Sequence, residues 1–233
     1  MAIGVRRAFG LGARADAAEL LDSGRLSRSE VEANLADLVR LNRLPGGTDT
    51  SIVAIERLME SGNAARILDV GTGAGDMPIA FARRGWQVVA VDVNPHVLGV
   101  ARAGLAAVPG VEVVEADALA LPLEDGSVDV AHCSLLVHHL APEEAVAALR
   151  EMRRVCRRGV VVNDLRRGIL PLAATWMTVM ALGRSHVTRA DGPVSARRAY
   201  TLHELDLLLA EAGLTPRWRS AAWLPRVVTA ATA

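Results

Sequence analysis

Residues 67–76 read ILDVGTGAGD, a short apolar run followed by a loop that contains three glycines. Glycines at such a place let the backbone turn tightly, approach a ligand and open a helix whose N-terminus carries a positive dipole. A dinucleotide-binding fingerprint needs Gly or Ala at position 76, where this chain has Asp76. An acid at a helix start is poorly suited to a pyrophosphate, so the loop predicts a ligand without phosphate at that point.

Four more apolar runs follow this stretch and alternate with helical patterns. The runs are 88–93, 111–116, 128–133 and 160–162, and the helix candidates between them are 77–84, 95–107 and 143–157. Strands that are almost continuously apolar and alternate with helices predict a mostly parallel sheet covered on both faces. Ligands of such sheets bind at the carboxyl ends of the strands.

Two acids stand at those strand ends. Asp92 closes the second run, where its two carboxylate oxygens are placed to accept hydrogen bonds from both hydroxyls of a ribose. Asp117 closes the third run, where a carboxylate can accept from the exocyclic amine of an adenine while the next backbone N–H, of Ala118, donates to the ring.

Taken in order, these motifs, together with residues 128–131 (VDVA) and 138–140 (HHL), resemble class I S-adenosylmethionine-dependent methyltransferases of the broad small-molecule type. The resemblance covers about residues 60–165. It implies an α/β, Rossmann-like fold with a mostly parallel seven-stranded sheet and helices on both faces. It also implies S-adenosyl-L-methionine as the cofactor and S-adenosyl-L-homocysteine as the product.

The resemblance assigns cofactor contacts residue by residue. Asp69, Gly71 and Gly73 of the glycine loop are assigned to the methionine portion of the cofactor, and Asp92 to its ribose. Val93, Asp117 and Ala118 are assigned to the adenine. Cys133 and Ser134, at the start of the loop after the fourth strand, are assigned to the sulfonium. Taken singly, the glycines could instead serve helix–strand packing and the acids could be turn or capping residues.

Catalytic candidates lie in the loops after the fourth and fifth strands. The family places the first loop near the transferring methyl group, which favours His138 and His139 as general bases, since histidine has the most suitable unperturbed pKa. Asp164 is a third candidate, although it could simply pair with Arg166 or Arg167. The two histidines could equally be a loop-to-helix connector with one ring hydrogen-bonded.

The same loops predict that no metal is bound. Magnesium-dependent catechol-type methyltransferases use an acid after the fourth strand and Asp-Asn after the fifth. Here the first position is Cys133 or Ser134, and the second reads Asn163-Asp164, so the set of oxygen ligands is incomplete.

An insertion over 168–200 separates the fifth strand from the C-terminal region. Its first half, 169–182, is apolar on more than one face, which predicts a lid helix over a lipophilic substrate, or else core packing or a dimer contact. Its second half contains Asp191-Gly192-Pro193, a turn signal that predicts a mobile loop. The substrate-side candidates in the insertion are Trp176, Met180, His186, Arg197 and Tyr200.

The flanking regions complete the predicted domain organisation. Residues 1–60 read as an N-terminal helical cap, in which Ser27 and Glu30 form a capping box, and 61–233 as the cofactor-binding domain. Thr201 and Glu204 form another capping box, and two β-prone runs, 216–222 and 226–229, predict a hairpin that adds one antiparallel strand.

Composition narrows the function further. The 26 basic and 26 acidic residues cancel, which argues against nucleic acid as a partner. The chain contains no lysine, so a reductase with a Tyr-x-x-x-Lys pair is excluded. The longest charge-free stretch, 168–183, has 16 residues and is shorter than the ~20 of a membrane-spanning helix. Two cysteines without metal-ligand spacing favour a reducing, cytoplasmic setting.

These observations predict methyl transfer to oxygen or carbon of a lipophilic small molecule of secondary metabolism, of phenolic, polyketide-like or quinone-like type. One alternative is a non-catalytic regulator or partner subunit that binds S-adenosylmethionine. An NAD(P)-dependent reductase is disfavoured by Asp76. The oligomeric state is expected to be a monomer or homodimer.

Overall fold

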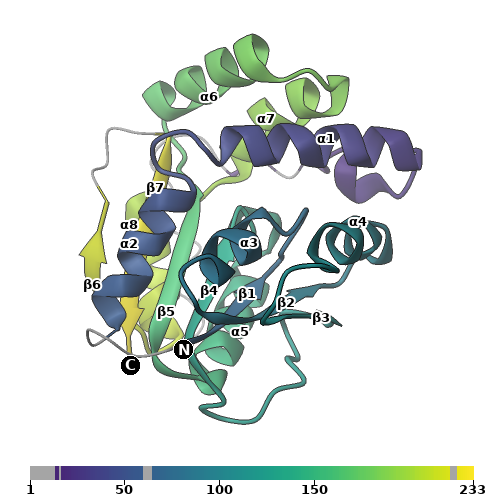
Figure 1. Cartoon of the computed structure of the whole chain (residues 1–233). Coiled ribbons are helices and arrows are strands. Elements are labelled where there is room, and N and C mark those ends of the chain that lie inside the picture. Colours follow the sequence, from purple (N-terminus) through teal and green to yellow (C-terminus); the bar gives the residue numbers. More distant parts are fainter. Residues whose placement is uncertain (1–13, 16, 60–64, 221–224) are drawn as a thin grey trace.

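A seven-stranded sheet forms the centre of the computed structural model, which describes residues 14–15, 17–59, 65–220 and 225–233 (Figure 1). The strands lie in the order β3-β2-β1-β4-β5-β7-β6. Their bounds are β1 Arg66–Val70, β2 Gln87–Asp92, β3 Val111–Glu115, β4 Val128–Ser134, β5 Cys156–Leu165, β6 Thr215–Arg219 and β7 Arg226–Thr232.

Strands β1 to β5 are all parallel, whereas β7 pairs antiparallel with both β5 and β6. This arrangement confirms the predicted Rossmann-like sheet and the C-terminal hairpin. Residues 221–222 of the predicted sixth strand lie outside the described residues. Strand order reverses direction between β1 and β4, and a ligand crevice is expected at that point in a doubly wound sheet.

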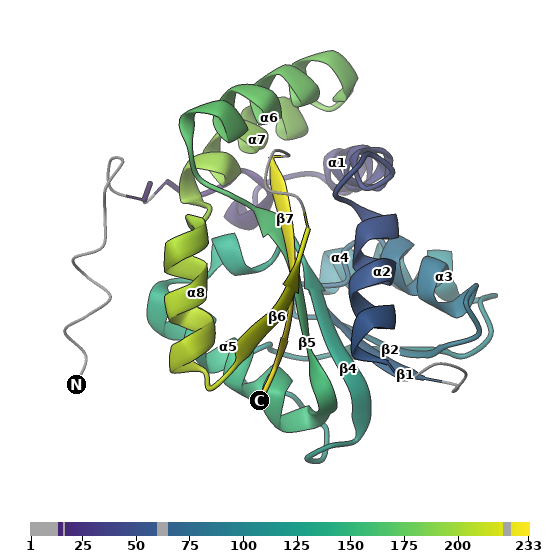
Figure 2. The same ribbon diagram turned by 90° about the vertical axis from the view of Figure 1, so that its left-hand side faces the viewer.

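Helices cover both faces of the sheet (Figure 2). On one face lie α2 Thr48–Leu58, α3 Asp76–Ala82 and α4 Pro95–Leu105, and on the other lie α5 Pro142–Val155 and α8 Leu202–Glu211. The two largest core clusters are mainly aliphatic, and the one on the α2–α3 side also contains the rings of Phe81 and Trp86. The predicted capping box of Thr201 and Glu204 begins α8.

Three helices lie across the carboxyl ends of the strands: α1 Arg28–Leu41, α6 Ile169–Leu182 and α7 His186–Arg198 (Figures 1 and 2). The predicted capping box of Ser27 and Glu30 begins α1. Two short 3₁₀ turns lie at Leu21–Ser23 and Val137–His139. These elements form the roof of the site described below.

The prediction of a mobile loop around residues 191–193 is wrong, because this stretch is the middle of α7. Gly192 gives α6 and α7 their close approach: a Cβ atom there would lie 2.8 Å from Cγ1 of Val179. The Asp191 carboxylate accepts hydrogen bonds from the backbone N–H groups of Leu20 and Leu21, at 2.8 and 3.1 Å. Tertiary contacts therefore explain two of the three residues of the turn signal, Asp191 and Gly192.

Helix α2 differs in position from α1, although both precede β1. Ile52, Ala54 and Ile55 of α2 are buried in the same core cluster as Ile67 of β1, so α2 packs on the sheet and does not cover the strand ends. The domain boundary at residues 60 and 61 stays a prediction.

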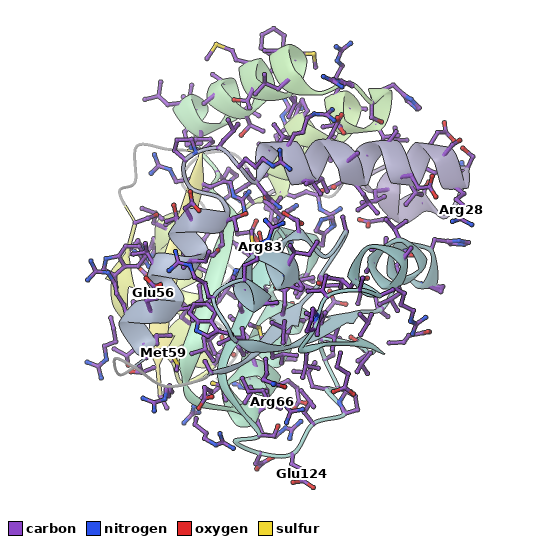
Figure 3. The ribbon with its side chains drawn as sticks, viewed as in Figure 1. Arg28, Glu56, Met59, Arg66, Arg83 and Glu124 are labelled. Carbon is purple, nitrogen blue, oxygen red and sulfur yellow. The ribbon has the colours of Figure 1, made fainter. Side chains whose placement is uncertain are left out.

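Helix α6 presents an apolar face to solvent as well as one to the interior. Figure 3 shows side chains, some of them ending in sulfur, projecting from its outer side. The exposed apolar residues on this helix are Ile169, Leu170, Trp176, Met177 and Leu182. Among the described residues, no helix combines the length and apolar character needed to cross a bilayer.

Candidate active site

A cavity of about 930 Å³ lies between the carboxyl ends of the parallel strands and the roof helices. Its floor comes from the ends of β1, β2 and β4 and from the residues after β3. Its roof comes from α1, α6 and α7. The size is that of a site for a cofactor and a small substrate together.

The glycine loop after β1 turns sharply under this cavity. Gly71, Gly73 and Gly75 have φ values of 70°, 57° and 83°, a left-handed conformation that side chains disfavour. The N–H of Gly71 donates to the carbonyl of Val91 at 2.9 Å, and the N–H of Gly73 donates to Oδ2 of Asp92 at 3.1 Å. The loop is thereby fixed against the end of β2.

Asp92 lies at the edge of the cavity with part of its carboxylate already hydrogen-bonded. Besides Gly73, the N–H of Asn94 donates to Oδ1 at 3.0 Å. Burial raises the pKa of Asp92 above its ordinary value, although the backbone N–H groups of Asn94 and Gly73 partly oppose this. A buried carboxylate with spare lone pairs is suited to accept from ligand hydroxyls.

Most of the predicted cofactor contacts line this single cavity. They are Asp69, Gly71, Gly73, Asp92, Val93, Asp117, Ala118 and Ser134. Cys133 does not line it: its side chain is buried in the core, and burial raises the pKa of its thiol well above the usual value. Because successive strand residues point to opposite sides of a sheet, only Ser134 of this pair reaches the cavity.

An arginine and an aspartate on the cavity wall are linked through a neutral side chain, at a place that the sequence motifs did not indicate. Arg226 of β7 donates to Oδ1 of Asn42 at 2.5 Å and to Oγ of Ser134 at 2.8 Å. Asn42 in turn donates through Nδ2 to Oδ2 of Asp76 at 2.9 Å. Asn42 therefore bridges a guanidinium and a carboxylate that both line the cavity.

The side chain of Arg226 is almost completely buried, yet within the described residues its guanidinium donates to the neutral side chains of Asn163, Asn42 and Ser134. Burial lowers the pKa of Arg226 to about 10, against the opposing charges of Asp164 and Asp76. A buried cation that hydrogen-bonds no carboxylate is suited to bind an anionic ligand group.

The carboxylate of Asp69 is held by buried side chains. His132 Nδ1 lies 2.7 Å from its Oδ1, and the hydroxyl of Thr72 donates to its Oδ2 at 2.8 Å. His132 Nε2 in turn lies 2.9 Å from Oγ of Ser51. This buried network fixes the end of β1, where the glycine loop begins.

The catalytic candidates His138 and Asp164 are in contact. Nδ1 of His138 lies 2.6 Å from Oδ1 of Asp164, and the backbone N–H of His138 donates to Oδ2 at 3.0 Å. Burial alone would raise the pKa of Asp164, but the charge of His138 and these hydrogen bonds outweigh it and lower the pKa. The carboxylate fixes the orientation of the ring and leaves Nε2 free.

His139 is oriented in the same way by a residue from the N-terminal segment. Its Nδ1 lies 3.0 Å from Oδ2 of Asp22, and its ring centroid is 4.3 Å from that of His138. Glu19 completes the group, with Oε1 3.7 Å from Nε2 of His138 and Oε2 3.8 Å from Nε2 of His139. Glu19, Asp22 and both histidines line the cavity, whereas Asp164 lies behind His138.

Arginine and tyrosine side chains hold this histidine loop from outside. Arg14 donates to the carbonyls of His138 and Leu140 at 2.5 and 2.7 Å, and Arg198 donates to that of His139 at 2.7 Å. The hydroxyl of Tyr200 donates to the carbonyl of Leu140 at 2.8 Å. The loop therefore has little freedom to move.

Comparison with known proteins agrees with this geometry. A family model described as a methyltransferase domain matches residues 67–159, which run from β1 into β5. Residues 67–159 form a methyltransferase domain. The matched stretch contains the glycine loop, both strand-end acids and the two histidines.

Individual relatives match the same part of the chain. An uncharacterized methyltransferase of Mycobacterium sp. (strain JLS) is 41% identical over 93 residues, which are 40% of this chain and 35% of that protein. Demethylmenaquinone methyltransferase of Thermus thermophilus is 41% identical over 98 residues, 40% of this chain and 43% of that protein. The match therefore spans less than half of either relative.

The likeness of fold extends further along the chain. The crystal structure of an S-adenosylmethionine-dependent methyltransferase from Aquifex aeolicus aligns with a TM-score of 0.65 at 21% identity, covering 89% of this chain and 98% of that one. This likeness shows that the methyltransferase domain and the elements around it share the class I methyltransferase fold.

None of the five predicted substrate-side residues lines the cavity. Trp176, His186 and Arg197 are exposed, and Met180 is half-buried outside the cavity. Tyr200 is buried and binds the histidine loop, as described above. Helix α6 turns a different side toward the methyltransferase domain, and its lining residues are Thr175, Thr178 and Val179.

The roof combines apolar side chains with polar ones, and two of its buried oxygens have no hydrogen-bond partner among the described residues. Leu35, Leu38 and Leu41 of α1 line it. Oδ1 of Asn34 and Oγ1 of Thr175 also belong to lining residues, and neither has a partner among the described residues. An unsatisfied buried acceptor is costly, so these atoms are suited to bind a polar group of a ligand.

Sequence reasoning missed the residues that come from outside the strand-end motifs. Glu19 and Asp22 precede α1, Asn42 follows α1, and Arg226 begins β7. The sequence motif does include Asp76, but it indicates only that a pyrophosphate is disfavoured and not that Asp76 pairs with Asn42. A charged residue at the start of an apolar strand, as at Arg226, was the one available signal.

Proposed function

We propose that the chain is an S-adenosylmethionine-dependent methyltransferase that transfers a methyl group to an oxygen or carbon atom of a lipophilic small molecule. The observation that carries the proposal is one cavity in which Asp92 and the glycine loop stand at one part of the floor and the Arg226–Asn42–Asp76 group at another. S-adenosylmethionine carries groups that complement both: ribose hydroxyls for Asp92, and a carboxylate and an ammonium for the Arg226–Asn42–Asp76 group.

The cofactor's amino-acid end is assigned to the charged group. Its carboxylate binds Arg226, and its ammonium binds Asp76, with Asn42 keeping the two side chains apart. Asp92 accepts from the ribose hydroxyls, while Asp117 and Ala118 bind the adenine. Asp76 also disfavours the pyrophosphate of a nicotinamide dinucleotide, which supports this cofactor over NAD(P).

The acceptor is assigned to the space under the roof. The leucines of α1 and Val179 of α6 favour an apolar molecule, and the unpartnered oxygens of Asn34 and Thr175 favour one that carries a hydroxyl. The similarity to a demethylmenaquinone methyltransferase supports a phenolic or quinone-like acceptor.

Methyl transfer is an in-line displacement on a carbon that the sulfonium already activates. The protein then has to align the acceptor, exclude water and assist ionisation of the acceptor hydroxyl. His138 and His139 line the cavity, their Nε2 atoms face Glu19, and Asp164 and Asp22 fix the rings. We assign the ionisation step to this pair.

A transfer assay tests the proposal. The protein is incubated with methyl-labelled S-adenosylmethionine and a panel of lipophilic phenols and hydroquinones, with hydrophilic catechols as the comparison panel. We expect label in at least one lipophilic product and formation of S-adenosylhomocysteine. Cofactor binding with no transfer to any panel member would favour the non-catalytic regulator, and absence of binding would reject the function altogether.

A further inference from the structure

Glu19, His138 and His139 form a group of three metal-ligating side chains that the strand-end motifs do not explain. Their nearest ligand atoms all lie within 4.8 Å of one another. They come from two segments far apart in the chain, the turn before α1 and the loop after β4.

The hydrogen bonds of the two rings are those of metal-bound histidines. A histidine that binds a metal through Nε2 usually donates its Nδ1–H to a carboxylate or carbonyl, which fixes the ring and raises its basicity. Here Nδ1 of His138 faces Asp164 at 2.6 Å, and Nδ1 of His139 faces Asp22 at 3.0 Å. Both Nε2 atoms are left facing Glu19.

Glu19 is an unusual residue for a site without a cation. Its side chain is 4% exposed, and its Oε1 has no hydrogen-bond partner among the described residues. The distances of 3.7 and 3.8 Å to the Nε2 atoms are too long for hydrogen bonds.

A metal ion between these atoms accounts for the spacing. Metal–nitrogen and metal–oxygen bonds of about 2.0–2.2 Å put neighbouring ligand atoms roughly 3.0–3.5 Å apart, so small side-chain movements are enough. The charges around the two rings are mixed: Glu19, Asp22 and Asp164 are carboxylates, and the guanidinium groups of Arg14 and Arg198 bind the backbone of the same loop. The cation nearest to Glu19, Arg198, lies 3.9 Å from Oε1 and also pairs with Asp22 at 3.6 Å.

We propose that Glu19, His138 and His139 bind a first-row transition-metal dication, such as zinc, whose remaining coordination positions face the methyl acceptor. Two imidazole nitrogens and one carboxylate oxygen favour such an ion over magnesium, which prefers oxygen ligands alone. Three protein ligands leave at least one position open to the cavity, as in catalytic metal sites. This revises the expectation of no metal, which considered only the loops after the fourth and fifth strands.

The role of the ion in catalysis rests on the proposed function, whereas its binding does not. An acceptor hydroxyl coordinated to the ion becomes more acidic and releases its proton to solvent. The oxygen lone pair then forms a bond to the methyl carbon, the sulfur–methyl bond breaks, and its electron pair stays on sulfur as the thioether. The histidines thus promote ionisation through the ion and not as free bases.

Zinc binding is measured first, without cofactor or acceptor. Tag-free protein is stripped with a chelator and titrated with Zn²⁺ against a chromophoric competitor. We expect one tight site in the wild type, with Glu19→Gln and His139→Ala each weakening the affinity at least ~10-fold. His186→Ala is the matched control, because His186 faces Glu30 at 3.5 Å on the surface without a second histidine, and it should bind as the wild type does.

The result that overturns the proposal is equal zinc affinity in the wild type and Glu19→Gln, or no tight site at all. Circular dichroism and binding of S-adenosylhomocysteine show whether each variant is folded. If zinc binds as expected and S-adenosylhomocysteine does not, the metal site stands and the methyltransferase proposal fails. If the reverse holds, the histidines act without a metal.

Discussion

The backbone N–H of Gly73 donates to Oδ2 of Asp92 at 3.1 Å, so the loop after β1 and the acid after β2 form one structural unit. The sequence places these two residues in separate motifs. In the fold the carboxylate fixes the glycine loop and also faces the cavity. A mutation can therefore be tested for two separate effects, on stability and on cofactor binding.

Asp92→Asn should weaken binding of S-adenosylhomocysteine about 10- to 100-fold, because a hydrogen bond to a charged group contributes ~1.5–3 kcal/mol. Both carboxylate oxygens of Asp92 accept a backbone N–H, from Gly73 and from Asn94, and the amide can keep only one of these hydrogen bonds. We expect the free energy of unfolding to fall by about 1–3 kcal/mol, as measured by denaturant titration, because one donor is left without its acceptor. A large loss of stability with unchanged affinity would show that Asp92 is only structural.

Cofactor affinity should also decrease as the pH is lowered, because Asp92 then becomes protonated. Ribose hydroxyls donate to the ionised carboxylate, so binding requires loss of the Asp92 proton. In the free protein the pKa of Asp92 lies above the ordinary 3.8. The affinity should therefore reach its full value near neutral pH and decline in mildly acidic buffer. The wild type and Asp92→Asn are compared by calorimetry, and the variant should lose this part of the pH dependence.

Arg226→Met tests the assignment of the cofactor's amino-acid end. Loss of the guanidinium should weaken S-adenosylhomocysteine about 10- to 100-fold, since charge-assisted hydrogen bonds are stronger than neutral ones. Methylthioadenosine lacks the amino acid and should bind the variant and the wild type alike, which also controls for folding. An equal loss of affinity for both ligands would show that Arg226 does not bind the amino-acid end of the cofactor.

The contrast between Asp92 and Arg226 shows what sequence could predict. Asp92 stands next to its strand, and the order of strands in a parallel sheet brings strand ends together, so its place followed from local pattern. Arg226 meets Asn42 across 184 positions of the chain, and Glu19 meets His138 in the same manner. Such contacts depend on how α1 and β7 pack, which periodicity does not encode.

The roof helices show the other limit. Helix α6 is apolar on more than one face, so its pattern does not indicate which residues face the cavity. The sequence favours Trp176 and Met180, whereas Thr175 and Val179 line the cavity. In α7 the local preferences of Gly192 and Pro193 for a turn were overcome by packing against α6.

Gly192→Ala should destabilise the protein, because the new methyl group would lie 2.8 Å from Cγ1 of Val179 and overpacking costs about 1–3 kcal/mol. Gly99→Ala is the matched control. Gly99 lies in α4 with nothing within 4 Å of its added Cβ, so that variant should gain roughly 0.5–1 kcal/mol from helix propensity. Thermal unfolding compares the two, and equal stabilisation of both would contradict the close α6–α7 packing.

Asp191→Ala should release the segment that carries Glu19 and Asp22. The amides of Leu20 and Leu21 lose the carboxylate to which they donate and should exchange faster with deuterium. The amides of Arg184 and Ser185, which donate to Asp37 at 2.7 Å, should keep their protection and serve as an internal control. Unchanged exchange at Leu20 and Leu21 would show that Asp191 does not hold the segment.

The central claim is that the cavity binds S-adenosylmethionine, and calorimetric titration of the wild-type protein with S-adenosylhomocysteine tests it most directly. We expect saturable binding at one site, with no detectable heat from NAD⁺ under the same conditions. Absence of binding by S-adenosylhomocysteine, or tighter binding of NAD⁺, would contradict the claim.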